Sequence, residues 1–482
     1  MSTRFSAGKR ISGLSATVTF AAALTFALAV AFTAARAADN PEAVKPAKPN
    51  IVFVLVDSLR AESLSCYGYH RPTTPFIDQL AGEGILFQNY FANSTWTAPT
   101  VATLFTGLSS IRHGRNNVID RLPENVPVLA GVLRDAGYRT LAVTCNPVAG
   151  SRWGYQRGFD IFDDFSIPLY LETDLFPNEK SESADARHQQ LVGAPGLDDK
   201  MVGIALRLTR NIPAEQPFFL LVYLYDPHWD YNPLPEYKAM FVDPEYKGEV
   251  TGAYWNLREN EGAQFKTPAD LKHFVDLYEA EIRQTDDAIE RLVTTLRERG
   301  QLKDTDILII SADHGEEFME HGVLSHGKNL FEQAAKVPGI VVSPGRLPKG
   351  VVSETMATHI DWLPTLAKAA GATVPGGLPG VDLFTFQDGQ WSPPEREGVF
   401  MHVMLDEPGA RPMIAIRAKD VKVIRHLDDN SAVAYDLAAD PGEQNPIPVT
   451  ADTPAYAVLL AKLDAWYAEE KELLACALPC TS

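Results

Sequence analysis

Apolar runs and amphipathic segments alternate along residues 50–343, and this pattern predicts the main elements of the fold. Uninterrupted apolar runs are typical of strands that are buried on both faces of a parallel sheet. Apolar residues at helical spacing predict amphipathic helices, the longest of which ends before Gly300. Strands that alternate with helices favour an α/β sandwich with a mostly parallel central sheet. We predict strands at 50–56, 85–91, 140–144, 218–225, 306–312 and 339–343, and helices at 74–84, 126–137 and 270–299.

The pattern changes after about residue 390, where short strands separated by turns replace the long apolar runs. We therefore predict a catalytic domain at 50–390 and a smaller antiparallel α+β subdomain with a tail at 391–482. Cys476 and Cys480 of this tail could pair in an oxidising compartment, and their spacing leaves the pairing open. The subdomain is expected to contain strands at 399–404, 413–417, 422–426 and 432–437 and a helix at 454–475.

The N-terminus has the pattern of a targeting segment. Basic residues precede a charge-free stretch at 11–35, and Ala35-Arg36-Ala37 has the small-residue spacing that signal peptidase reads. We predict a signal peptide at 1–37 and a linker at 38–49. The alternative is a retained membrane anchor, because 25 uncharged residues could span a bilayer. Both interpretations predict export, to a periplasmic or extracellular location, and membrane contact is expected only if the segment is retained.

Composition narrows the class of partner. The chain has 482 residues, and its 43 Lys and Arg against 62 Asp and Glu give a net charge of −19. A nucleic-acid partner is disfavoured, because phosphate backbones require clustered cations. The proportions of 45% apolar and 22% charged residues are those of a soluble globular protein.

Three predicted strands end in residues that can bind a divalent cation. Asp57 follows the first strand, Asp313 and His314 follow the strand at 306–312, and His228 follows the strand at 218–225. Any one Asp after a strand usually caps the next helix or turn. Because ligands bind at the carboxyl ends of strands in open α/β sheets, the convergence of three such ends favours a metal site.

A fourth candidate lies in the segment from Ser94 to Gly107. Thr97 occupies an expected N-cap position, Pro99 fits the first helical turn, and an apolar helix follows. The segment could be a capped helix and nothing more. Alternatively, the Thr97 hydroxyl could be a nucleophile among free helix amides that stabilise a transferred anion. Position alone leaves both interpretations open.

Six further motifs stand in order along the chain. They are Val-Asp-Ser-Leu-Arg at 56–60, Cys-Tyr-Gly-Tyr at 66–69, the segment from Pro99 to Gly107, Asp-His-Gly-Glu at 313–316, His-Gly-Lys-Asn-Leu-Phe-Glu at 326–332, and Ala-Tyr-Asp-Leu-Ala-Ala-Asp-Pro-Gly-Glu at 434–443. Taken together, these motifs resemble the sulfatase family of the alkaline phosphatase superfamily over residues 48–445. The resemblance implies an alkaline-phosphatase-like sandwich and a metal-dependent hydrolase of ester bonds.

The sequence departs from this family at the nucleophile. Sulfatases that use formylglycine carry Cys or Ser where this chain has Thr97, and Arg where it has Val101. Threonine cannot be oxidised to formylglycine, so none is expected. Ser58 replaces the second Asp of the family's opening pair, and Asn146 lies near the place of its Lys-x-His element. If Thr97 formed an ester with the transferred group, that ester could be broken only by a second attack at its sulfur or phosphorus atom. This requirement favours phosphoryl or phosphodiester chemistry slightly over sulfate ester hydrolysis.

The predicted mechanism is metal-assisted substitution with Thr97 as nucleophile. One divalent ion would be held by Asp57, Asp313 and His314, with Thr97 beside it. The resemblance favours Ca²⁺, and Mn²⁺ or Zn²⁺ are possible.

Four further residues are assigned to the transferred group or the leaving oxygen. His326 and His228 are candidate acids for the leaving oxygen. Lys328 could hold a nonbridging oxygen, and Asn146 could donate a hydrogen bond to the same group. His228 could equally be a core residue packed beside Trp229. We expect His321 to be an ordinary loop residue, and Glu316 and Glu317 to face solvent or cap the next helix, with Glu316 alternatively supporting the site.

The substrate class is an ester of a small molecule, a glycan or a lipid headgroup. Aromatic residues at 229–255 could form a wall against a ring or could pack on the domain edge. Two other functions stay open: a membrane-anchored transferase of phospho-headgroups, and a catalytically impaired protein that binds a metal or an anion.

Overall fold

The structure is a computed structural model that describes residues 48–164, 195–253, 262–404 and 411–477. The predicted signal segment at 1–37 lies outside the described residues, as does Cys480. Lys48–Ser482 forms one compact unit, and its division into the two predicted domains stays a prediction. Among the residues that the structure describes, no helix is long and apolar enough to cross a membrane.

The central feature is an eight-stranded sheet. β1 (Ile51–Val56) lies inside it, between its parallel neighbours β5 (Phe218–Leu224) and β6 (Ile307–Ala312). Every residue of these three strands is buried, as continuous apolar runs predict. β9 (Gly339–Val342) is antiparallel to its two neighbours, so the sheet is mostly parallel and the predicted α/β class is confirmed. The strand order is β10-β2-β9-β6-β1-β5-β3-β4, with β2 at Ile85–Phe91, β3 at Arg139–Thr144, β4 at Ile161–Asp163 and β10 at Val351–Thr358.

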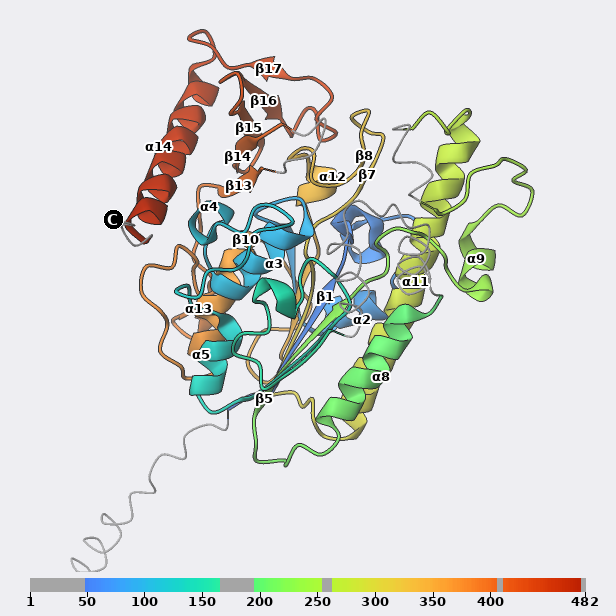
Figure 1. Ribbon diagram of the computed structural model, residues 1–482, viewed down its shortest axis with the longest axis vertical. Coiled ribbons are helices and arrows are strands. Elements are labelled where there is room, and N and C mark those ends of the chain that lie inside the picture. The colour runs from blue at the N-terminus through green and yellow to red at the C-terminus, as the bar shows by residue number, and fades with distance from the viewer. Residues whose placement is uncertain (1–47, 165–194, 254–261, 405–410, 478–482) are drawn as a thin grey trace, which may run out of the picture. The chain divides into compact units, whose positions relative to one another are not determined.

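Helices cover both faces of the sheet (Figure 1). One group contains α3 (Thr97–Thr106), α5 (Leu129–Asp135) and α13 (Trp362–Ala369), which contact one another. The other contains the long α11, packed against α2 and α8. The helices predicted at 74–84, 126–137 and 270–299 are therefore present, whereas the edge strand β10 was missed because Ser353, Glu354 and Thr355 interrupt its apolar pattern. The second group has the bounds α2 Pro75–Glu83, α8 Leu197–Thr209 and α11 Pro268–Glu298.

A five-stranded antiparallel sheet follows in the C-terminal part, as predicted. α14 (Pro454–Ala477) covers one face of this sheet, where Leu463 packs against Ile414 and Ile416. The other face belongs to a core cluster that includes Trp96 and Leu330 of the larger part. The C-terminal sheet thus lies against the start of α3 and the segment after β8 (Leu324–Ser325). Its strands are β13 (Val399–Val403), β14 (Met413–Arg417), β15 (Val421–His426), β16 (Ala432–Asp436) and β17 (Ile447–Pro448).

Candidate active site

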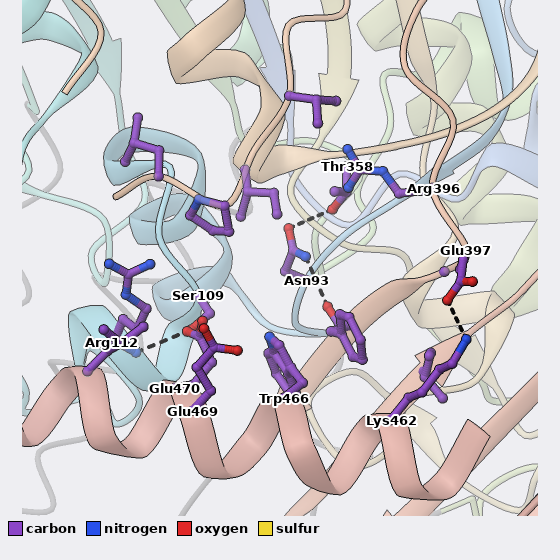
Figure 2. Close-up of a pocket in the computed structure, with 18 of the residues that line it drawn as sticks. Asn93, Ser109, Arg112, Thr358, Arg396, Glu397, Lys462, Trp466, Glu469 and Glu470 are labelled. Atoms are coloured by element: carbon purple, nitrogen blue, oxygen red, sulfur yellow. Dashed lines mark hydrogen bonds and ion pairs between the residues drawn. The ribbon is translucent and has the colours of Figure 1, made fainter. Parts of the chain in front are cut away.

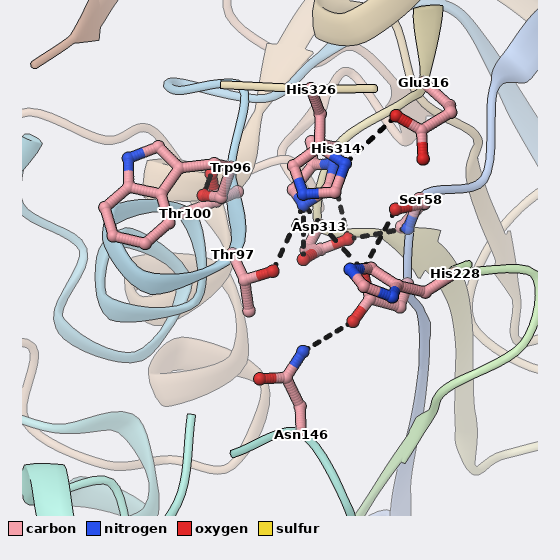
Figure 3. A network of polar contacts seen from close by, with 12 residues as sticks. Ser58, Trp96, Thr97, Thr100, Asn146, His228, Asp313, His314, Glu316 and His326 are labelled. Atoms are coloured by element: carbon pink, nitrogen blue, oxygen red, sulfur yellow. Dashed lines mark hydrogen bonds and ion pairs between the residues drawn. The ribbon is translucent and has the colours of Figure 1, made fainter. Parts of the chain in front are cut away.

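The carboxyl ends of β1 and β6 bring three predicted metal ligands together (Figure 3). Asp57 follows β1, and Asp313 and His314 follow β6, its direct neighbour in the sheet. One ligand atom from each residue lies within 4.8 Å of the others, and all three residues are fully buried. The register of two parallel strands therefore produces the cluster that the sequence predicted from strand ends.

Thr97 lies beside this cluster at the start of α3. Its Oγ1 is 3.2 Å from Nε2 of His314. The predicted N-cap position was wrong by one residue: Trp96 is the N-cap, and Thr97 is the first residue of the helix. The Thr97 hydroxyl is directed at the cluster, where it contacts His314 (Figure 3).

Hydrogen bonding fixes the orientation of the His314 ring. Its Nδ1 lies 2.8 Å from the carbonyl oxygen of Gly315, which can only accept, so Nδ1 carries the proton. Nε2 faces Thr97 and Asp313, whose Oδ2 is 3.2 Å away. An unprotonated imidazole nitrogen is the form that binds a metal.

The electrostatics of the cluster fit a divalent cation. Burial raises the pKa of Asp57 well above its usual range, and the neighbouring Asp313 raises it further. Two buried carboxylates this close repel each other unless a proton or a cation lies between them. Carboxylate oxygens and an imidazole nitrogen are also suitable donors for a divalent metal ion.

Three polar residues hold these carboxylates in place. The Tyr223 hydroxyl is 2.7 Å from Oδ2 of Asp313 and 3.0 Å from Oδ2 of Asp57. Ser58 donates its backbone N–H to Oδ1 of Asp313 and its hydroxyl to Oδ1 of Asp57. Asn146 donates Nδ2 to Oδ2 of Asp57 at 2.6 Å, so it lies at the edge of the cluster, and its predicted hydrogen bond to the transferred group stays a prediction.

Sequence reasoning missed Tyr223 because it lies inside an apolar strand and looks like a core aromatic. Its register was the available signal, since Tyr223 pairs with Leu55 only two positions before Asp57. The left-handed backbone of Ser58, with φ of 57°, was likewise not predictable from the sequence.

The His326 ring packs against the His314 ring, with the two ring centroids 4.2 Å apart. Its Nδ1 is 3.0 Å from Oε1 of Glu316. Burial lowers the pKa of His326, and burial raises the pKa of Glu316 to about 8. The prediction that Glu316 and Glu317 face solvent was wrong: both are buried, where Glu316 contacts His326 and Glu317 contacts His321.

His228 and Lys328 complete the predicted set. The His228 ring packs on Trp229 at 4.4 Å, and it also lies 5.2 Å from the His326 ring. His228 thus packs beside Trp229, as one of the two expectations had it, and its role as an acid stays a prediction. Lys328 is near enough to His326 for its charge to contribute to the lowered pKa of that ring. His321 instead contacts Glu317 and the carbonyl oxygen of Gly442, as an ordinary loop residue would.

A separate cavity of about 690 Å³ lies beside α14 (Figure 2). Trp466, Lys462 and Glu470 of α14 line it, together with Arg112 and Arg396. Ion pairs and hydrogen bonds already engage several of these side chains, such as Lys462 with Glu397 and Ser109 with Glu470. None of the predicted metal ligands or catalytic residues lines this cavity.

Solved structures of known proteins share the fold. A protein solved in complex with its substrate D-glucosamine-2-N,6-O-disulfate is 20% identical, with a TM-score of 0.70 over 89% of this chain and 98% of that one. The phosphonate monoester hydrolase of Agrobacterium radiobacter is 22% identical, with a TM-score of 0.69 over 89% of this chain and 96% of that one.

Sequence relatives and family models agree with this likeness. N-acetylglucosamine-6-O-sulfatase of Bacteroides thetaiotaomicron is 23% identical over 85% of this chain and 84% of its own length. Arylsulfatase A of Bos taurus is 27% identical over 84% of this chain and 80% of its own length. A model described as N-sulphoglucosamine sulphohydrolase, C-terminal, matches residues 319–471. The sulfatase model matches residues 49–372, which is more than half of the chain, and the protein therefore belongs to the sulfatase family of ester hydrolases.

Proposed function

We propose that this protein is a metal-dependent hydrolase of sulfate or phosphate esters that uses Thr97 directly as its nucleophile. The observation that carries the proposal is the position of the Thr97 hydroxyl, 3.2 Å from Nε2 of His314 and at the start of α3. A hydroxyl so placed can attack a group that is bound between the helix and the metal ligands.

Asp57, Asp313 and His314 are the residues that would hold the ion, with Thr97 beside it. When bound, a divalent cation would polarise the ester and lower the pKa of the Thr97 hydroxyl. The imidazole donor suits Mn²⁺ or Zn²⁺, whereas the resemblance to sulfatases favours Ca²⁺.

Thr97 would form a bond to sulfur or phosphorus as the bond to the leaving oxygen breaks. Pro99 has no N–H and the Thr100 N–H bonds the Trp96 carbonyl oxygen, so the backbone amides of Thr97 and Ala98 are the ones that would stabilise the negative charge that develops. Water would then attack the same sulfur or phosphorus atom and release Thr97. The need for this second displacement favours phosphate esters slightly, because a threonine ester cannot release the bound group by cleavage of a carbon–oxygen bond, as formylglycine can.

The surrounding residues would bind the substrate and move its protons. His326 and His228 are the candidates to protonate the leaving oxygen, and Glu316 would orient His326 through the 3.0 Å contact. We assign Lys328 to a nonbridging oxygen. Asn146 is assigned to holding Asp57, to which it donates a hydrogen bond.

We further propose that the substrate is a small-molecule or glycan ester. Curated relatives are named as sulfatases of N-acetylglucosamine and of hexuronate, and a structural neighbour is named as a phosphonate monoester hydrolase. These names cover both sulfur and phosphorus chemistry, so the element that Thr97 attacks must be measured. We also propose that the protein is exported, which N-terminal sequencing of the mature chain would test by finding a start near Ala38.

The test is hydrolysis of an aryl sulfate, an aryl phosphate and an aryl phosphodiester with Ca²⁺, Mn²⁺ or Zn²⁺ added. We expect turnover of one ester, lost by at least about 1,000-fold in Thr97→Ala. Thr100→Ala is the matched control, because this hydroxyl lies on the same helix and bonds only its own turn, at the Trp96 carbonyl oxygen. Turnover that survives Thr97→Ala would exclude Thr97 as the nucleophile. No turnover despite bound metal would indicate a binding protein or an acceptor-dependent transferase.

A further inference from the structure

The motif at 434–443, which the sequence analysis singled out, has no role in the mechanism above. It ends at Glu443, which is 1% exposed and lies in the turn after β16. Glu443 accepts a hydrogen bond from the backbone N–H of Glu332 at 2.6 Å. The end of this motif therefore contacts the segment that carries His326 and Lys328.

Lys422 of β15 is the centre of this contact. Its side chain is fully buried, and its Nζ lies 2.8 Å from Oε1 of Glu332 and 2.8 Å from Oε1 of Glu443. The same Nζ donates a hydrogen bond to the carbonyl oxygen of Leu330 at 2.9 Å. One ammonium group thus forms ion pairs with two carboxylates and donates a hydrogen bond to one backbone oxygen.

The charges in this cluster balance. Arg417 adds a second cation, with its Nε 3.3 Å from Oε1 of Glu332. Burial acts to raise the pKa of Glu332, but Lys422 and Arg417 more than offset it and lower the pKa to about 2. Two cations therefore face two carboxylates at a largely buried position.

The cluster is attached to the loop that faces the metal ligands. Leu330 follows Lys328 by two residues and His326 by four. The loop is held at a second point by Thr95, which donates its hydroxyl to the Asn329 carbonyl oxygen at 2.6 Å. Thr95 comes two residues before the proposed nucleophile, so the loop and the start of α3 are fixed to each other.

We infer that Lys422, Glu332 and Glu443 form a charge clamp by which the C-terminal sheet positions His326 and Lys328 against the substrate. These three are positioning residues, since none lies among the metal ligands or the residues assigned to the reacting group. The effect on catalysis rests on the proposed function, whereas the effect on the loop does not.

The test uses the double variant Lys422→Met/Glu443→Gln, which removes one charge of each sign and leaves the Arg417–Glu332 pair. Glu443→Gln alone is a milder second variant in case the double variant does not fold. Lys419→Met is the matched control, an exposed lysine on the hairpin that leads into β15. Amide hydrogen exchange of residues 324–331 and of β6, metal affinity by calorimetry, and kcat and KM are measured on each protein.

We expect faster exchange at 324–331 with β6 unchanged, metal affinity within two-fold of the parent, and kcat lowered about 10- to 100-fold. Misplacement of catalytic groups by about 1 Å has effects of that size. Unchanged exchange at 324–331 with kcat within two-fold would overturn the clamp. A parallel loss of metal affinity and of protection in β6 would also overturn it, because the cluster would then be purely structural. If the parent protein hydrolyses none of the esters, the proposed function fails while hydrogen exchange still decides the clamp.

Discussion

The metal-ligand cluster and the charge clamp are both buried groups of ionisable side chains, yet their electrostatics are opposite. Asp57 and Asp313 lie together beside Nε2 of His314, and burial and the Asp313 charge raise the pKa of Asp57. In the clamp, cations separate the carboxylates, and the pKa of Glu332 is lowered to about 2. Burial raises the pKa of Glu443, the second carboxylate of the clamp, as it raises that of Asp57, and the neighbouring cations outweigh burial at Glu332.

The difference shows how a site for a ligand can be told from a structural ion cluster. A clamp with matched charges is complete within the protein, and removal of one partner leaves an uncompensated buried charge. The metal-ligand cluster is complete only when a proton or a cation is added. A substitution that removes one charge should therefore stabilise the metal-free folded protein at the metal-ligand cluster and destabilise the folded protein at the clamp.

The largest effect is expected from Asp313→Asn. Turnover should fall by roughly 1,000-fold or more, since a metal ion supplies several kcal/mol of charge stabilisation. In chelator, however, the variant should be more stable than the parent, because one of two repelling carboxylates is gone. The new amide could also donate to the Tyr223 oxygen, which frees the Tyr223 proton for Asp57.

Thermal unfolding with and without added metal checks this prediction. The parent should gain about 2.7 kcal/mol at a metal concentration 100 times Kd, and the variant should gain little. A variant that is less stable than the parent in chelator would contradict the comparison, because the two carboxylates would then stabilise the fold without a metal ion.

The next largest effect is expected from Lys422→Met, in the opposite direction. Removal of one partner of a buried ion cluster costs about 3–5 kcal/mol, because Glu332 and Glu443 lose their shared cation. Lys422→Met/Glu443→Gln should recover part of this loss. Urea unfolding measures both, with Lys419→Met as the control. A single variant as stable as its parent would show that the clamp contributes nothing to folding.

A smaller effect should appear when the pH is lowered. The pKa of Glu332 is about 2 in the folded protein, against 4.5 for an unperturbed glutamate. A lowered folded pKa contributes stability that is present above the unfolded value and is lost as the pH falls through the folded value. We expect a loss of the order of 3 kcal/mol between about pH 4.5 and 2, and a flatter profile for Glu332→Gln. If the free energy of unfolding in urea has the same pH dependence in the parent and in Glu332→Gln, the cations do not stabilise the Glu332 carboxylate.

The smallest effect is expected at an exposed ion pair. Arg411 pairs with Asp428 and Asp429 at 2.7 and 2.8 Å, distances as short as those in the clamp. Water and salt screen this pair, so Arg411→Ala should leave the melting temperature unchanged within error. A loss as large as that of Lys422→Met would show that burial does not explain the strength of the clamp.

Much of the fold could be predicted because its signals are local. The runs at 50–56, 218–225 and 306–312 are apolar throughout, and only strands covered on both faces tolerate that composition. Asp57, Asp313 and His314 could be placed together because parallel strands end at one edge. The burial of Glu316 and the hydrogen bonds from Tyr223 could not be predicted, because both depend on neighbours more than 80 residues away.

The sequence by itself determined the α/β class, the sulfatase-like motifs and the residue types available at the strand ends, since these depend on composition and on order along the chain. Only the tertiary structure decided that Thr97 faces His314, that Asn146 bonds Asp57, and that Lys422 reaches the loop of His326 and Lys328. Each of these contacts joins residues that are distant along the chain. Their formation depends on strand order, helix packing and burial, which no local pattern contains.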